Sequence, residues 1–329
     1  MQTHHTLQLR FQWFARVTVM FFTLTIAAPM ATAVEPGGLS VTAEGTTATR
    51  AIFHLHPDEK IRNEDHMAMD LIHPEYWHYS VMSDDFKTCM KVHKMLRLNT
   101  SYYVNARTKH MDGIVKKAAA DGIQQVVNLG AGYDSRAYRF RKAMPEVKFF
   151  EIELPEMIKE KKRRLKKVLG EVPDYVAFVP IDFNTQTIPE ELIKAGYDEN
   201  LKTLFIWEGV TYYISGEAVD GTLKFIASRS APGSSVVFDY LPTDVIKGNF
   251  DKYPDLRGLA FWVAHKAEPF VFGFDEGKGP SYVEARGFTV LSDIGADDMN
   301  AMYLTGSDGK LVGPAASAFR ILHASVSVR

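Results

Sequence analysis

Between residues 125 and 241 the chain alternates short apolar runs with longer polar stretches, and this order limits the folds open to it. The stretches between the runs have helical spacing, most clearly from Pro155 and from about Ser215. Strands that alternate with helices predict a parallel sheet with helices on both faces. The runs with the length and composition of buried strands are 125–129, 147–154, 175–182, 203–208 and 234–241.

Two further runs, 287–294 and 318–328, are typical of a hairpin that completes such a sheet. The sequence therefore predicts a doubly wound α/β fold with a mostly parallel, seven-stranded sheet over residues 123–329. Apolar residues at helical spacing predict a helical cap over residues 51–122.

The first 33 residues differ from the rest and resemble a secretory signal. Arg10 and Arg16 precede an apolar run that ends in the small residues Ala31 and Ala33. This layout predicts export, or association with a membrane through residues 10–33. Residues 34–50 are small, polar and Gly-rich, and we expect a flexible arm there.

Charge and cysteine content exclude several classes of function. Lys and Arg number 38 against 40 Asp and Glu, a net charge of -2, so no bulk charge favours nucleic acid. Cys89 is the single cysteine, which excludes an internal disulfide and a multi-thiolate metal site, and we expect it to be buried. Residues 160–167 form a basic run. Ile158, Leu165 and Leu169, within and beside this run, form one helical stripe, so we expect the charged side chains on a solvated outer face.

A ligand of such a sheet lies at the carboxyl ends of its strands, where the winding direction changes. The first strand is followed by Gly130 and Gly132, whose missing side chains allow a tight turn close to a ligand. A dinucleotide fold has a third glycine at the position of Ser135. That substitution disfavours a nicotinamide or flavin oxidoreductase, which remains an alternative.

Acidic residues follow the next strands. Glu153 lies 23 positions after Gly130, close to the spacing of about 20 at which a carboxylate accepts ribose hydroxyls. Glu151 shares its face of the strand and is the alternative. Asp182 and Phe183 follow the third strand and suit an adenine amino group and ring. Together these strand ends predict a nucleoside site.

The stretches VVNLGAGYDSRAYR, FFEIELPEMIKEKKRRL, IDF and FIWEGVTYYI together resemble the leucine carboxyl methyltransferase family. The resemblance extends over roughly residues 42–300. It implies a Rossmann-like class I methyltransferase fold, S-adenosyl-L-methionine as cofactor, and methyl transfer to a small-molecule acceptor, with a protein C-terminal carboxyl as a second option.

The resemblance also assigns residues by position. Arg107 matches an arginine that binds the methionyl carboxylate of the cofactor, and Glu208 matches an acid near its amino group. Glu153 matches the ribose acid, which is commonly Asp in the family, so the longer side chain is a departure. Asp134 and Arg136 are expected to hold the loop rather than the substrate. The expected cofactor-binding set is Arg107, Gly130, Gly132, Glu153, Asp182, Phe183 and Glu208.

The methyl acceptor and its activation stay open at this level. Tyr212 and Tyr213 are candidates for the substrate side, with core packing as the alternative. A carboxylate acceptor needs no general base whereas an alcohol or phenol gains from one, and no catalytic base is assigned. The histidines of the front segment match no metal-binding spacing. An exported or membrane-anchored binding protein on a degenerate methyltransferase fold is the alternative function. The signal-like N-terminus favours it, because the cofactor is expected in the cytoplasm and not outside it.

Overall fold

The computed structural model describes residues 39–73, 83–95, 100–181 and 186–327. The signal-like segment 1–33 lies outside the described residues, so its expected export or anchoring stays a prediction. The chain divides into two compact units, residues 1–32 and 33–329, and the description that follows concerns the second.

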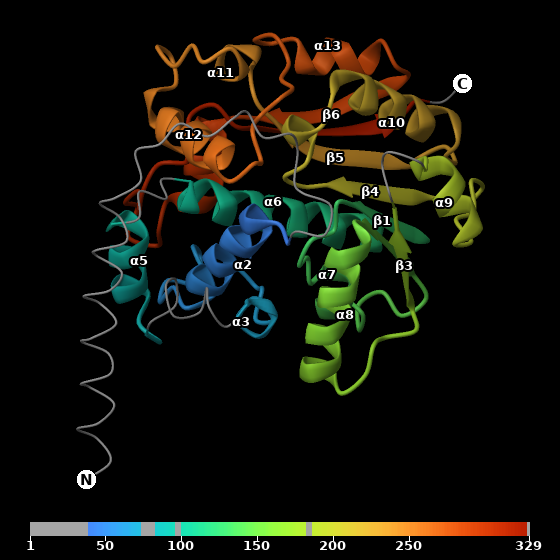
Figure 1. Cartoon of the computed structure of the whole chain (residues 1–329), viewed down its shortest axis with the longest axis horizontal. Helices are drawn as coiled ribbons and strands as arrows, with labels where there is room; N and C mark the ends of the chain where they lie inside the picture. Colours follow the sequence, from blue (N-terminus) through green and yellow to red (C-terminus); the bar gives the residue numbers. More distant parts are fainter. Residues whose placement is uncertain (1–38, 74–82, 96–99, 182–185, 328–329) are drawn as a thin grey trace. The chain divides into compact units, whose positions relative to one another are not determined.

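Seven strands form one sheet, in the order β3-β2-β1-β4-β5-β7-β6 (Figure 1). Strands β1 to β5 pair in parallel, while β7 runs antiparallel to both β5 and β6. All seven predicted strands and the terminal hairpin are confirmed. The strands are β1 Gln125–Leu129, β2 Lys148–Glu153, β3 Val176–Pro180, β4 Thr203–Trp207, β5 Ser235–Tyr240, β6 Phe288–Ile294 and β7 Arg320–Val326.

Helices connect the strands and precede the sheet. Helix α8 begins with a proline in its first turn, and Ser215 caps α10 by accepting from the amide of Ala218. The helices are α2 Val41–His54, α3 Ala68–Leu71, α5 Phe86–Met95, α6 Ser101–Ala120, α7 Arg136–Arg139, α8 Pro155–Leu169, α9 Ile188–Lys194, α10 Gly216–Ser228, α11 Thr243–Ile246, α12 Arg257–His265, α13 Gly279–Glu284 and α14 Ala296–Met299, with short 3-10 turns Thr211–Tyr213 and Pro254–Leu256 and a π-helix Asn300–Leu304.

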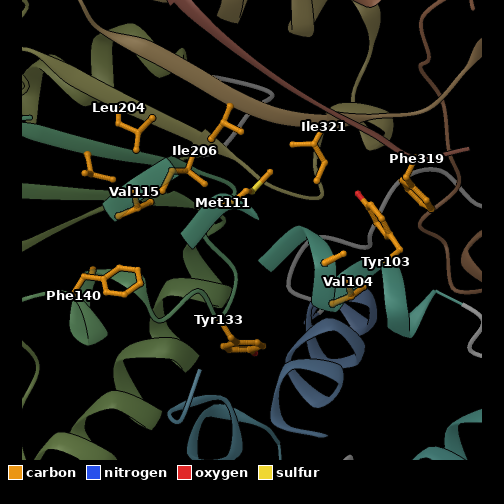
Figure 2. Packing of buried hydrophobic residues seen from close by; sticks show 14 of the residues in the cluster. Tyr103, Val104, Met111, Val115, Tyr133, Phe140, Leu204, Ile206, Phe319 and Ile321 are labelled. Atoms are coloured by element: carbon orange, nitrogen blue, oxygen red, sulfur yellow. The ribbon is translucent and has the colours of Figure 1, made fainter. Parts of the chain in front are cut away.

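The two faces of the sheet bury separate apolar clusters. One cluster joins α6, α7 and α8 to the strands, and the other joins α9, α10 and α13 to the opposite face. Figure 2 shows the first cluster, with Met111 and Val115 of α6 beside Leu204 and Ile206 of β4. Alternate residues of each strand therefore face different helices, as expected for a sheet covered on both sides.

The predicted flexible arm of residues 34–50 is wrong from Val41 onward, where α2 begins. Ser40 caps this helix by accepting from the amide of Ala43, and Glu268 accepts from the amides of Val41 and Thr42. Ala48 and the residues after it pack into a third apolar cluster with α3 and α5. Tertiary contacts thus outweigh the weak helical propensity of the small, polar residues. Cys89 is fully buried, as expected.

The basic run in α8 is also placed differently from the prediction. Leu169 is 41% exposed, whereas Lys161 and Arg164 are buried. Both cations lie within the same helical stripe as Ile158 and Leu165, so they point inward with them. Lys161 pairs with Glu151, and Arg164 pairs with Glu44 and Glu160. The solvated outer face therefore carries only part of the charge of this run.

Among the residues that the structure describes, no helix is both long and apolar enough to cross a membrane.

Candidate functional site

The turn after β1 is packed against the loop after β4. Gly130 and Gly132 have φ angles of +71° and +42°, a region that suits glycine. A Cβ atom on Gly130 would stand 2.4 Å from Cγ2 of Val210. Ser135 is buried and its hydroxyl donates to Asp65 at 2.6 Å. The residue that replaces the third glycine therefore fastens the turn to the helical cap.

Glu153, the last residue of β2, faces this turn. Its Oε2 accepts from the amide of Gly132 at 2.8 Å, and its Oε1 accepts from the amide of Leu154 at 2.8 Å. Burial raises the pKa of Glu153, although the two amides oppose the shift. Glu151 instead pairs with the buried Lys161 at 2.7 Å. Of the two candidate acids, Glu153 is the one beside the glycine turn, and no described cation pairs with it.

Glu208, which follows β4, lies between two guanidinium groups. Its Oε1 is 2.9 Å from Nε of Arg107, and its Oε2 accepts from Nη1 of Arg136 at 2.6 Å. Burial by itself would raise the pKa of Glu208, but Arg136 and Arg107 hold it below its ordinary value. The structure therefore brings together Arg107 and Glu208, two residues that the sequence places 101 positions apart.

Arg136 holds the glycine turn in place, as expected for it and Asp134. It donates to Asp134 at 2.5 Å and to Asp112 of α6 at 2.6 Å. Burial opposes ionisation of Asp134, but Arg136 and Lys161 lower its pKa. The same network continues into the cap through Arg139, Asp65 and Arg50.

Asp239 of β5 is a site residue that the sequence analysis missed. Its side chain is fully buried, and it accepts from Nη1 of Arg107 at 2.6 Å, from the hydroxyl of Tyr212 at 3.1 Å and from the hydroxyl of Tyr103. Its second oxygen accepts from the amide of Gly209 at 2.6 Å. The available signal was its position near the carboxyl end of an apolar run, the feature that identified Glu153.

The two tyrosines predicted for the substrate side have different surroundings. Tyr212 is buried, and its hydroxyl is engaged by Asp239 and by Arg107 at 3.3 Å. Tyr213 is half-buried and packs edge-on against the ring of Tyr212, and the ring of Phe270 contacts both tyrosines. Tyr212 is therefore part of the buried ion-pair network, and Tyr213 keeps part of its surface open.

Asp182 and Phe183 lie outside the described residues. The preceding Ile181 is buried, and its amide donates to the carbonyl of Glu153 at 3.0 Å. In the described part of the chain, no group of three or more His, Cys, Asp or Glu residues is placed to hold a metal ion.

The sheet order and the site define the class of the protein. A parallel sheet with strands 3-2-1-4-5, completed by an antiparallel β7 between β5 and β6, is the Rossmann-like arrangement of class I methyltransferases, and its winding reverses between β1 and β4. The residues described above gather at this point. The crystal structure of a DUF574 family protein from Streptomyces avermitilis has a similar fold, with a TM-score of 0.54 at 12% identity over 84% of this chain and 96% of that one.

The sequence profile described as leucine carboxyl methyltransferase matches residues 43–227, more than half of the chain. The chain belongs to this family, whose members are S-adenosylmethionine-dependent methyltransferases, and it is an enzyme of that class.

Relatives from several bacteria agree with this assignment. The protein YktD of Bacillus subtilis is 28% identical over 220 residues, which cover 66% of this chain and 69% of the relative. A Mycolicibacterium smegmatis protein is 32% identical over 201 residues, covering 61% of this chain and 66% of the relative. A Streptomyces coelicolor protein, SCO7813, is 31% identical over 202 residues, covering 61% and 69%. All three are described provisionally as S-adenosyl-L-methionine-dependent methyltransferases.

The residues at the strand ends fit such a cofactor. Nε of Arg107 and Oε1 of Glu208 are buried and form an ion pair at 2.9 Å, and neither makes a hydrogen bond with any other described residue. None of the hydrogen bonds among the described residues uses Nη2 of Arg107. A buried ion pair is stabilised when further hydrogen bonds satisfy the remaining protons and lone pairs of its two groups. A ligand with its own carboxylate and ammonium groups would supply both kinds of partner.

Proposed function

We propose that the enzyme transfers the methyl group of S-adenosylmethionine to an oxygen atom of a small molecule, a carboxylate or a hydroxyl compound. The observation that carries this proposal is the meeting of the glycine turn, Glu153, Glu208 and Arg107 where the winding of the sheet reverses. Three separate strand ends and one cap helix contribute to it.

The chain's own residues would hold the cofactor in three places. Arg107 would bind the methionyl carboxylate through its unused Nη2, and Glu208 would accept from the amino group. Gly130 and Gly132 would let the backbone pass close to the methionyl part. Glu153 would accept the ribose hydroxyls, since each carboxylate oxygen now engaged by an amide has a second lone pair. Asp182 and Phe183 keep the adenine role that the sequence assigns to them.

Methyl transfer from this cofactor requires little chemical activation by the protein. The cofactor supplies a methyl group already activated by a sulfonium, so orientation of the acceptor is the main requirement, and orientation can contribute about 7–11 kcal/mol. Burial raises the pKa of Tyr213, so its hydroxyl stays protonated at neutral pH. It would therefore act as a hydrogen-bond donor to the acceptor and not as a base. An acceptor that is already ionised, such as a carboxylate, fits a site of this kind.

The test is methylation of a panel of carboxylic acids and phenols by the full chain with methyl-labelled cofactor. Mild alkali then separates the two products, because methyl esters release labelled methanol and methyl ethers do not. We expect alkali-labile label from at least one carboxylic acid. Label that appears only on nitrogen or carbon acceptors would contradict the proposal.

The cellular location remains a prediction from the sequence. We propose that the chain is synthesised with a signal or anchor in residues 1–33. Sequencing the N-terminus of the protein recovered from fractionated cells tests this. A new N-terminus at Val34, or recovery with the membrane fraction, is expected, and an intact Met1 on a cytoplasmic protein would contradict it.

A further inference from the structure

Each of four parallel strands ends in or near a carboxylate. Asp134 follows β1, Glu153 ends β2, Glu208 follows β4, and Asp239 is the penultimate residue of β5. These four acids come from separate elements and meet at one edge of the sheet. A ligand bound at this edge is therefore exposed to the summed charge of all four carboxylates and of the cations that accompany them.

The cations that accompany them do not balance this charge. The continuous ion-pair network contains four arginines and five carboxylates, and Glu153 adds a sixth carboxylate that forms no ion pair with a described cation. Lys161 does not close the gap, because it is matched by Glu151. The ion-pair network and Glu153 together thus have two negative charges in excess. The members are Arg50, Asp65, Arg107, Asp112, Asp134, Arg136, Arg139, Glu153, Glu208 and Asp239.

The hydrogen bonds show that the key acids act as acceptors. Both oxygens of Asp239 accept, from an amide, a guanidinium and two tyrosine hydroxyls. Both oxygens of Glu153 accept from backbone amides. Charges in a site so poorly exposed are weakly screened, so an excess of two is strongly felt by a ligand.

We infer that this excess negative charge selects the positively charged methyl donor over its neutral product. The inference rests on the proposed cofactor site and adds a property to it. S-adenosylmethionine has a net charge of +1 at neutral pH, from its sulfonium, ammonium and carboxylate. With an ionised carboxylate as acceptor, transfer breaks the bond from sulfur to methyl and forms the bond from the carboxylate oxygen to methyl, and no proton has to leave. The sulfur keeps the electron pair, and S-adenosylhomocysteine leaves with no net charge. Loss of the attraction favours release of the product.

The test compares two stable ligands of similar shape by titration calorimetry on the full chain. Sinefungin has a protonated amine near the position of the sulfonium, whereas S-adenosylhomocysteine is neutral there. We expect sinefungin to bind at least about tenfold more tightly, because one extra charge near two uncompensated carboxylates is worth that much or more. Equal affinities, or tighter binding of S-adenosylhomocysteine, would overturn the inference and leave the cofactor site standing. If neither nucleoside binds, the proposed cofactor site fails as well.

Variants show whether the named carboxylates cause the preference. Glu153→Gln and Asp239→Asn each remove one negative charge at nearly constant size, and each is expected to reduce the ratio of the two affinities several-fold. Glu153→Gln keeps the test valid if the buried Asp239 variant fails to fold. Asp293→Asn, in an ion pair on the opposite face of the sheet, is the matched control and should leave the ratio unchanged. An unchanged ratio in a folded Glu153→Gln protein would overturn the assignment.

Discussion

Two clusters of arginine, aspartate and tyrosine lie on opposite faces of the same sheet, and their difference helps to identify the functional one. The site cluster is Arg107, Asp239, Tyr103 and Tyr212. The edge cluster is Arg320, Asp293 and Tyr240, which join β7, β6 and β5. Asp239 and Tyr240 are neighbours on β5, so strand alternation sends them to different faces.

The edge cluster is a satisfied, partly solvated ion pair. Nε and Nη2 of Arg320 both donate to Asp293, and the two side chains are 38% and 13% exposed. In the site cluster the side chains of Arg107 and Asp239 are 4% and 0% exposed, and Nε of Arg107 lacks a hydrogen bond. The two clusters therefore differ in burial, since the charges of the site cluster are almost fully removed from water and those of the edge cluster are partly solvated. The buried cluster is the one beside the glycine turn, where Arg107 also pairs with Glu208.

The largest expected effect is that of Asp239→Asn, which breaks the site cluster. Removal of one charge from a buried pair leaves Arg107 partly uncompensated and should cost about 3–5 kcal/mol of unfolding free energy. The affinity for S-adenosylhomocysteine should fall at least about tenfold, because Arg107 and the Gly209 loop lose a shared anchor. Urea unfolding and titration calorimetry measure the two effects. Wild-type stability in this variant would show that the cluster is not the anchor we describe.

The unfolding free energy should fall at acid pH, because two histidines on the face of the sheet that carries the site cluster are neutral when the chain is folded. Burial lowers the pKa of His110 on α6 and of His323 on β7 from 6.5 to about 4. The unfolded chain therefore binds more protons than the folded chain between those values. This contribution to stability is complete above pH 6.5 and is lost as the pH falls toward 4, with a slope of up to about 2.7 kcal/mol per pH unit for both groups.

The histidine contribution is measured by urea unfolding between pH 4 and 7. His323→Asn should reduce the slope by roughly half, since one of two titrating groups is removed. The same slope in the wild type and in this variant would show that His323 does not stay neutral in the folded chain.

Glu153→Gln tests the site without breaking an ion pair. The amide oxygen of Gln can still accept from one of the two backbone amides, but its NH2 group leaves the other amide without an acceptor, so the unfolding free energy should fall by about 1–3 kcal/mol. The affinity for S-adenosylhomocysteine should fall about tenfold, because a neutral amide accepts ribose hydroxyls less strongly than a carboxylate. A large loss of stability with unchanged affinity would assign Glu153 to the fold and not to the site.

The smallest expected effect is that of Asp293→Asn in the edge cluster. A partly exposed ion pair contributes about 1 kcal/mol or less to stability. The affinity for S-adenosylhomocysteine should not change, since the edge cluster lies on the opposite face of the sheet from the site cluster. A tenfold loss of affinity here would remove the distinction between the two clusters.

The alternation of apolar and polar stretches was enough to predict every strand, because buried parallel strands have a strong and local signal. The same pattern located Glu153, which ends a strand, whereas Glu208 was assigned from the family resemblance. It could not locate the partners of Asp239, since Tyr103 and Arg107 lie on a helix more than 130 positions earlier. The burial of Lys161 likewise depends on Glu151 of another element. Ion pairs between residues that are far apart in the sequence depend on the fold and produce no periodic pattern in the sequence.

The central claim is that the cofactor site lies at the carboxyl ends of β1, β2 and β4. Hydrogen–deuterium exchange of the full chain with and without S-adenosylhomocysteine tests it most directly. We predict slower exchange of backbone amides in 130–136, 153–154 and 208–210, with no change near Asp293 on the opposite face. Saturable binding that protects other segments and leaves these three unchanged would contradict the account.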